Sequence, residues 1–339
     1  MKKCLSFDDV LLEPKYSEIF SRSEISLNSS LGSSENVGLN FSLPIISSPM
    51  DTVTEGEMAQ AMYNCGGLGI IHRYNSIRDQ ALLVKSCDEA LVGAAIGVSG
   101  DYLERAKAVL DNGANILCID IAHGHHSMMR HALKTLRNTF GWDVHIMAGN
   151  VATLKGFNDL ADWGANSIRV GIGGGSICST RIQTGHGMPT LQSVIDCSVS
   201  DRDAFLIADG GLKNSGDIVK SLAAGADFVI LGSLLASAEE APGEIHLDAD
   251  GSTWKSYRGM ASKEAQVSWR GRVASEEGVA SRVPVKGPVE NILKSLEKGI
   301  RSGLSYSGCK SLLEFSSLST FVEQTHAGRI ESSTHIQTR

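Results

Sequence analysis

The feature that most constrains the fold is a rhythm of short apolar runs, each rich in β-branched residues and closed by small or polar ones. Helix-like segments separate these runs along the chain. The runs span residues 44–47, 68–72, 92–98, 116–120, 145–149, 167–173, 205–209 and 228–232. Continuous apolar strands that alternate with helices are typical of a parallel sheet, and eight such units predict a closed (β/α)8 barrel. A doubly wound open sheet is the alternative, but it usually has fewer strands.

The remaining segments are predicted from the same patterns. Helical periodicity covers residues 101–112, 127–138, 154–163, 215–224, 233–240 and 289–300. In the polar first forty residues, the apolar side chains of 1–14 are expected to plug one end of the core. Residues 261–282 are charged and interrupted by glycine, which predicts a mobile flap. We expect one barrel domain over residues 1–339, with a mobile polar tail at 325–339.

Charge and cysteine usage narrow the possible partners. The chain has 31 Lys and Arg against 38 Asp and Glu, a net charge of -7, which argues against nucleic-acid or membrane-surface binding. Seven cysteines are scattered without a metal-binding spacing, and neither an apolar N-terminal signal region nor a membrane-length apolar run is found. These features predict a cytoplasmic protein in a reducing compartment.

The ends of the predicted strands carry the polar residues that the strands themselves lack. Asp51, Arg73, Asp120, Asn150 and Asp209 all lie at or just beyond such an end. Active sites of (β/α)8 barrels lie where the carboxyl ends of the strands meet. The sequence therefore predicts that these side chains surround a common site.

One strand end differs from the others because three consecutive glycines follow it and a cysteine comes three residues after them. The segment 170–181 reads VGIGGGSICSTR. Glycines allow a backbone to approach a ligand closely, and a thiolate held in such a loop is placed to act as a nucleophile. Most intracellular cysteines are inert core residues. The polar strand ends favour the catalytic interpretation of Cys178.

Two further strand ends suggest a nucleotide site. Asp209-Gly210-Gly211 and Gly232-Ser233 follow the seventh and eighth strands, where barrels often bind phosphate through loop amides. Asp209 is suited to accept hydrogen bonds from a ribose diol, or else to cap a turn. The histidines at 123, 125 and 126 lack accompanying metal ligands, so we interpret them as a polar loop.

Five ordered motifs resemble the IMP dehydrogenase/GMP reductase family. They are residues 47–53 (SSPMDTV), 173–178 (GGGSIC), 208–211 (ADGG), 231–233 (LGS) and 257–260 (YRGM), within a match from about residue 5 to 306. The resemblance implies a barrel that binds a purine 5′-monophosphate, forms a covalent cysteine adduct at purine C2 and uses a nicotinamide cofactor. It also implies a homotetramer.

The resemblance assigns roles to individual positions. It implies that Cys178 is the nucleophile and Thr180 the hydroxyl beside the adduct. The substrate-binding positions it implies are Ser48, Met50, Asp209, Gly211, Gly232, Ser233, Tyr257, Gly259 and Met260. Asp120, Asn150 and Arg169 resemble positions that face the nicotinamide. The carbonyl groups of Gly173, Gly175 and Cys178 resemble a loop that holds K⁺ in the dehydrogenases. The loop departs from the family pattern at Gly174, often proline, and at His186, often valine.

The family contains two reactions that share the attack of the cysteine on C2. A dehydrogenase oxidises IMP with NAD and then hydrolyses the adduct, whereas a reductase expels ammonia from GMP and reduces the adduct with NADPH. Dehydrogenases usually carry regulatory modules after the second strand, and the segment between residues 72 and 92 has room for only one helix. They also carry an Arg-Tyr pair in the flap, and residues 261–281 contain none.

These features favour the GMP reductase reaction with NADPH, GMP and IMP being substrate and product. A reductase needs a carboxyl group to protonate the departing ammonia. Lys263 aligns with the glutamate expected in reductases, so Glu264 after a shift of one residue is the predicted acid, with Glu276 and Glu277 as alternatives. The other hypotheses are an IMP dehydrogenase without regulatory modules and a purine-nucleotide-binding barrel without turnover.

Overall fold

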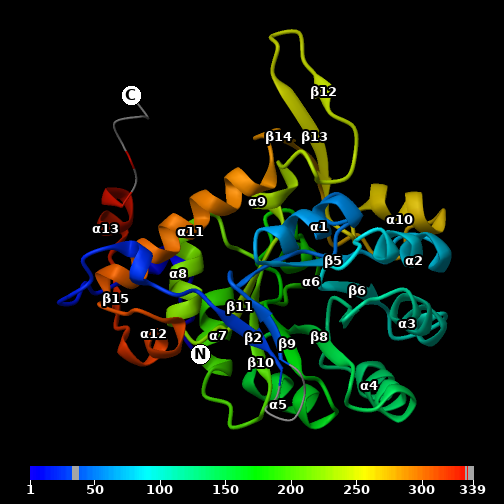
Figure 1. Ribbon diagram of the computed structural model, residues 1–339, viewed down its shortest axis with the longest axis horizontal. Coiled ribbons are helices and arrows are strands. Elements are labelled where there is room, and N and C mark those ends of the chain that lie inside the picture. Colours follow the sequence, from blue (N-terminus) through cyan, green and yellow to red (C-terminus); the bar gives the residue numbers. More distant parts are fainter. Residues whose placement is uncertain (33–37, 333, 335–339) are drawn as a thin grey trace.

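Eight parallel strands close into a barrel in the computed structural model, which describes residues 1–32, 38–332 and 334 (Figure 1). The strands are β4 (Ile45–Ser47), β5 (Leu68–Ile71), β6 (Val92–Ile96), β7 (Ile116–Asp120), β8 (His145–Val151), β9 (Ser167–Val170), β10 (Phe205–Asp209) and β11 (Phe228–Leu231). Pairing of β11 with β4 closes the ring. The predicted (β/α)8 barrel is confirmed, and β7 and β10 have the predicted bounds.

Helices cover the outside of the barrel, as continuous apolar strands require. They are α1 (Gly56–Asn64), α2 (Ile77–Lys85), α3 (Tyr102–Asp111), α4 (Ser127–Phe140), α5 (Leu154–Asp162), α7 (Thr190–Cys197), α8 (Ser215–Ala223) and α11 (Val289–Tyr306). α11 contacts both α8 and α1 and so completes the ring of helices. Only α2 lies between β5 and β6, which agrees with the prediction that no module is inserted there.

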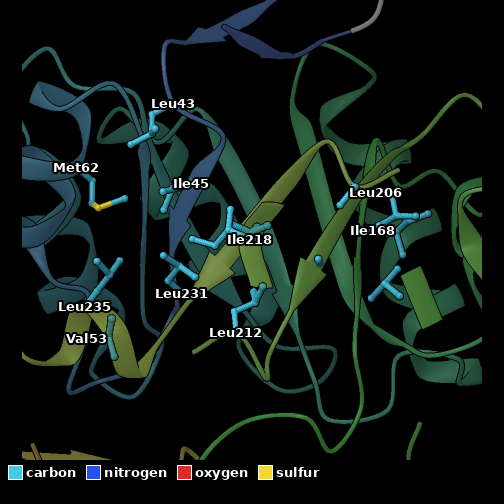
Figure 2. Close-up of a cluster of buried hydrophobic side chains, with 14 of the residues drawn as sticks. Leu43, Ile45, Val53, Met62, Ile168, Leu206, Leu212, Ile218, Leu231 and Leu235 are labelled. Carbon is cyan, nitrogen blue, oxygen red and sulfur yellow. The ribbon is translucent and has the colours of Figure 1, made fainter. Parts of the chain in front are cut away.

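Alternating strand side chains build two apolar layers. Ile45 of β4 and Leu231 of β11 point outward and pack with helix residues such as Met62 and Ile218 (Figure 2). The neighbouring Ile46 belongs to a second cluster, which fills the inside of the barrel. Successive side chains of a strand point to opposite faces, so each strand contributes to both layers.

A short hairpin plugs the amino end of the barrel. It consists of β2 (Ser29–Leu31) and β3 (Leu39–Phe41), whose Leu31 and Phe41 join the inner cluster. The rings of Phe41 and Phe228 meet edge to face with centroids 5.7 Å apart, and Phe228 is the first residue of β11. Aromatic pairs prefer this geometry.

Apolar residues of 1–14 are buried in the core as expected, but in its outer layer and not in this plug. β1 (Val10–Leu12) pairs with β15 (Phe321–Glu323), and Phe7 is buried in the outer layer. The Nζ of Lys220 on α8 donates to the Phe7 carbonyl at 2.8 Å. These backbone contacts hold the segment outside the barrel.

The chain beyond β11 forms structure that sequence patterns missed. The antiparallel strands β12 (His246–Leu247), β13 (Thr253–Arg258) and β14 (Ala280–Pro284) extend away from the barrel (Figure 1). Between β13 and β14 lies helix α10 (Lys263–Arg270), so the predicted flap is partly helical. Ser262 caps its start and Gly271, at φ 67°, its end.

Short elements complete the description. They are 3-10 helices at Phe7–Asp9 and Arg22–Glu24, and helices α6 (Thr180–Thr184), α9 (Ser233–Ala236), α12 (Leu312–Leu318) and α13 (His326–Glu331). Part of the predicted tail at 325–339 is thus helix α13, while residues 333 and 335–339 lie outside the described residues. Among the helices described, none is both long and apolar enough to cross a membrane.

Candidate active site

A cavity of about 410 Å³ opens where the carboxyl ends of the strands meet. Most of the predicted site residues line it: Ser48, Met50, Asp120, Asn150, Arg169, Gly173, Gly175, Cys178, Thr180, Asp209, Tyr257, Gly259 and Met260. Its volume is typical of a small-molecule site. A larger cavity of about 920 Å³ lies between β3, α1 and α11, but it contains none of these residues. We therefore place the chemistry in the smaller cavity.

Three predicted substrate positions lie just outside this lining. A Cβ atom at Gly232 would lie 2.9 Å from the Tyr257 hydroxyl and 3.4 Å from Met50 Sδ. A Cβ atom at Gly211 would lie 3.1 Å from the Gly174 carbonyl. Ser233 follows Gly232 and begins α9. These residues form a layer directly behind the cavity wall.

The Cys178 thiol faces this cavity. The Cys178 backbone N–H donates to the Gly175 carbonyl at 3.1 Å, and its Sγ lies 3.2 Å from Thr180 Oγ1. By contrast, burial raises the pKa of the Cys118 thiol to about 11 and that of Cys197 to about 12. Because the thiolate is the reactive form, those two buried cysteines are inert at neutral pH, and Cys178 is the cysteine placed for chemistry.

Glycines let the loops after β9 and β10 pack backbone against backbone. A Cβ atom at Gly171 would come within 1.9 Å of the Asp209 carbonyl oxygen. Gly210 has φ 94°, a conformation that other residues rarely adopt, and a Cβ there would lie 3.2 Å from the Gly175 nitrogen. The cysteine loop is therefore fixed directly against the Asp209 turn.

A buried arginine joins the predicted substrate and cofactor sides. Arg169 donates from Nη1 to Asp120 Oδ1 at 2.7 Å and from Nε to Asp209 Oδ2 at 3.0 Å. Asn150 Nδ2 donates to the same Asp209 oxygen at 2.8 Å. Burial alone would lower the pKa of Arg169, but the carboxylates of Asp209 and Asp120 raise it well above its ordinary value. The guanidinium therefore orients both carboxylates.

The root of the flap is fixed to the barrel beside this network. Arg258 Nη2 donates to Asp51 Oδ2 at 2.6 Å, which joins the end of β13 to the loop after β4. Tyr257 is buried, and burial raises the pKa of its hydroxyl to about 12, against a hydrogen bond from Ser176. Tyr257 therefore stays protonated at neutral pH and can donate a hydrogen bond into the site.

The flap brings Glu277, one of the alternative acids, to the cavity in place of the preferred Glu264. Glu264 lies on the exposed face of α10, whereas Glu277 lines the cavity. Ser179 N–H donates to the Glu277 carbonyl at 2.9 Å, and Val279 N–H donates to the Ile177 carbonyl at 3.0 Å. Residues 277–279 therefore pair with the backbone on either side of Cys178.

Comparison with known proteins gives this geometry a family. Residues 4–335 match the IMP dehydrogenase / GMP reductase domain. The chain belongs to this family. The inosine-5′-monophosphate dehydrogenase of Nitrosopumilus maritimus is 34% identical to it, over 98% of each chain. The GMP reductase of Leishmania major is 44% identical over 72% of this chain and 52% of its own length.

A solved structure supports the same assignment. A GMP reductase variant from Trypanosoma brucei, in complex with guanosine 5′-monophosphate, is 29% identical to this chain with a TM-score of 0.92. The similarity covers 99% of this chain and 98% of the other. The IMP dehydrogenase/GMP reductase family consists of oxidoreductases that act on purine nucleotides with a nicotinamide cofactor.

The predicted K⁺ loop of the family is present, but its carbonyl groups have other neighbours. The Gly175 carbonyl already accepts the Cys178 N–H. A Cβ atom at Gly173 would lie 2.9 Å from Arg181 Nε, so a guanidinium packs against this turn. Cation binding by the three carbonyl groups stays a prediction, and we assign no chemical step to K⁺.

The histidine loop after β7 has structural contacts. His125 Nε2 lies 2.7 Å from Asp159 Oδ2, and the His126 side chain accepts a hydrogen bond from the Met128 N–H at the start of α4. Within the part of the chain that the structure describes, no three His, Cys, Asp or Glu side chains gather to hold a metal ion.

Cavity residues outside the sequence assignment come from β5 and the flap. Arg73, Tyr74 and Arg270 line the cavity but received no specific role, and Glu277 was only an alternative to Glu264 as the acid. Arg73 follows β5, and its Nη2 donates to the Asp120 carbonyl at 3.1 Å. The polar strand end was a usable signal for Arg73.

Proposed function

We propose that this chain is a GMP reductase, which converts GMP and NADPH to IMP, ammonia and NADP. The observation that carries the proposal is that the cavity containing Cys178 is also lined by Glu277, whose backbone pairs with the residue that follows Cys178. Expulsion of ammonia needs a proton donor beside the adduct, and a carboxyl group serves as one. The Arg-Tyr pair by which the flap of a dehydrogenase activates water is missing from residues 261–281.

The chain's own residues account for the covalent steps. The Cys178 thiolate attacks C2 of the guanine base and forms a C–S bond. Glu277 protonates the exocyclic amino group, the C2–N bond breaks, and ammonia departs. Thr180 Oγ1, 3.2 Å from the sulfur, holds the proton of the resting thiol and can pass it on. When bound, the nicotinamide supplies the hydride that C2 receives before the C–S bond breaks and IMP leaves.

Binding groups are arranged around this reaction centre. Asp209 uses Oδ2 for Arg169 and Asn150, and we assign the rest of its carboxylate to the ribose hydroxyls. Tyr257, with Ser48 and Gly232 beside it, belongs to the phosphate side. Met50, Gly259 and Met260 surround the base, which their apolar and backbone surfaces suit.

The remaining polar groups fit the cofactor. Asp120 lines the cavity and is held through Oδ1 by Arg169, and Asn150 is held through Nδ2 by Asp209 and the Gly171 carbonyl. Fixed carboxylate and amide oxygens suit a nicotinamide carboxamide, which donates hydrogen bonds. We assign Asp120 and Asn150 to this role and Arg169 to their positioning.

An IMP dehydrogenase is the second candidate. Relatives that align with 98% of this chain are named as dehydrogenases, including the 38% identical enzyme of Cryptosporidium parvum. In that case water, rather than hydride, would resolve the adduct. Arg270 lines the cavity and is the flap arginine nearest to such a role.

Four parallel assays separate these candidates. The purified protein is incubated with GMP and NADPH, GMP and NADH, IMP and NAD, or IMP and NADP, and absorbance of the reduced nicotinamide is followed. Loss of absorbance with GMP and NADPH supports the proposal. Absorbance that increases only with IMP would establish a dehydrogenase. No change in any pair, together with measurable GMP binding, would leave a nucleotide-binding barrel.

A further inference from the structure

Two aromatic rings from distant parts of the chain stack at the edge of the cavity. Tyr74 lies just beyond β5, and Trp269 is on the last turn of α10. Their ring centroids are 4.0 Å apart with an interplanar angle of 17°. Arg270 lies over the Trp269 ring at 3.9 Å from its centroid, and Arg73 lies at 5.3 Å. Stacking and cation–π attraction both favour this contact.

Hydrogen bonds within the flap hold its two segments together. The buried Gln266 side chain donates from Nε2 to the Ser275 carbonyl at 2.6 Å and accepts the Ala274 N–H at 3.0 Å. The Glu277 N–H donates to the Ala261 carbonyl at 3.1 Å. Helix α10 and the return segment 272–277 are therefore held as one body, so a motion of the helix carries Glu277 with it.

The free end of this body touches the barrel through the stack. Val267 on α10 is 46% exposed, and Lys263, Glu264 and Ser268 are also exposed. An exposed helix with few buried side chains opens locally at low cost. Tyr74 and Trp269 provide the ring contact between this end of α10 and the barrel.

We infer that the Tyr74–Trp269 stack is a clasp that holds the flap closed, and that Trp269 thereby positions Glu277 beside Cys178. Trp269 does not line the cavity, so it acts as a positioning residue. The clasp itself is independent of which reaction the site performs. Its effect on ammonia release rests on the proposed function.

Limited trypsin digestion tests the clasp without reference to activity. Arg270 and Arg272 are exposed on the flap and offer cleavage sites. When opening is fast, cleavage follows the population of the open form. We expect Trp269→Ala to raise the rate of cleavage at these sites about tenfold and Tyr74→Ala to do the same. Trp269→Phe, which retains a stacking ring, should restore most of the protection.

Controls separate loss of the clasp from loss of the fold. Val267→Ala alters the same helix on its exposed face and should leave the cleavage rate unchanged. Thermal unfolding should shift little in any of these variants, because the rest of the barrel is untouched. Unchanged flap cleavage in Trp269→Ala would overturn the clasp, as would equal acceleration in Val267→Ala.

Kinetics then test the positioning role. In the reductase assay, Trp269→Ala should lower kcat about tenfold while KM for GMP changes little, since the proposed substrate-binding residues lie on the barrel, on β13 and in the two positions after it. Adding Trp269→Ala to Glu277→Gln should cause almost no further loss, because both act on the same step. Additive losses would refute positioning of Glu277. An inactive parent protein would refute the proposed function, while the digestion experiment would still decide on the clasp.

Discussion

The two ends of the barrel use the same strands for opposite purposes. At the amino end, the side chains of Leu31 and Phe41 pack into the apolar cluster inside the barrel. At the carboxyl end, the same strands finish in polar residues and glycines around a cavity of about 410 Å³. The comparison shows that packing energy and reactive groups are kept at separate ends. Substitutions should therefore affect stability or turnover according to the end they alter.

Burial also acts differently on charge at the two ends. His145, the first residue of β8, is buried with Ser167 as its hydrogen-bond partner at 2.9 Å, and burial lowers its pKa to about 3. Arg169 is equally buried, but two carboxylates keep it charged. A buried group without an ionic partner gives up its charge, whereas a paired one retains it.

The sharpest test of this separation is Cys178→Ala. We expect turnover to fall by a factor of about 10⁵ or more, because in the proposed mechanism the thiolate forms the covalent bond on which both later steps depend. The midpoint of thermal unfolding should stay the same, since the thiol is partly exposed at the cavity. Residual turnover near the parent rate would show that the chemistry lies elsewhere.

Within the carboxyl end, Glu277→Gln and Glu264→Gln form a matched pair. Loss of the proton donor should lower kcat by a factor of about 10² to 10⁴ in Glu277→Gln, while the exposed Glu264→Gln remains active. Steady-state kinetics of the reductase reaction and GMP binding by calorimetry check both variants. The reverse pattern would return the role of acid to Glu264, as the sequence predicted.

At the amino end, Phe41→Ala should lower stability and leave turnover unchanged, which is the opposite of the result expected for Cys178→Ala. Removing the ring that packs on Phe228 should lower the free energy of unfolding by about 3–5 kcal/mol, through lost burial and a residual cavity. Under conditions where the variant is folded, kcat and KM should match the parent. Urea unfolding and kinetics on the same sample measure both. A large change in kcat would mean that the two ends are coupled.

The smallest effect, taken per pH unit, concerns the pH dependence of stability. Unfolded histidine has a pKa near 6.5, so as pH falls below about 6.5 the unfolded state takes up a proton that His145 in the folded state refuses. The free energy of unfolding should therefore fall by up to about 1.4 kcal/mol per pH unit, in the window between about 6.5 and 3. Urea unfolding of the parent and His145→Gln at several pH values isolates this contribution.

The parent and His145→Gln must be compared because a second buried group, Asp227, also makes stability depend on pH. Burial raises the pKa of Asp227 to about 6, so the folded state binds the proton more tightly than the unfolded chain does. Its contribution to stability grows as pH falls and opposes that of His145. A pH slope that is the same in the parent and in His145→Gln would contradict the assignment of His145.

The fold was predictable where burial requires a recognisable pattern of apolar residues in the sequence. Strands enclosed on both faces become continuous apolar runs, which is why β7 and β10 were found with their bounds. The site was predictable for a related reason. A polar residue such as Asp209 or Cys178 at the end of such a run has no role in packing, and barrel geometry gathers those ends together.

The parts that were not predicted depend on contacts between distant segments. The described strands of the β2–β3 hairpin are three residues each, and Leu31 and Phe41 are their residues in the inner cluster. Glu277 reaches Cys178 because residues 277–279 pair with residues 177–179, about a hundred positions away. Local periodicity contains no information on such pairings, so the alignment of the front of the flap favoured Glu264.

The hydrogen bond between Ala261 and Glu277 has a consequence for how this barrel can change over time. The two ends of the flap, at Ala261 and Glu277, lie next to each other. The number of residues between them can therefore change without moving the strands of the barrel. Replacing the segment between these points would change the residues that the flap adds to the cavity, while the strand ends below it keep their positions. The part of the site that would select one proposed reaction over the other is thus a separable piece of the chain.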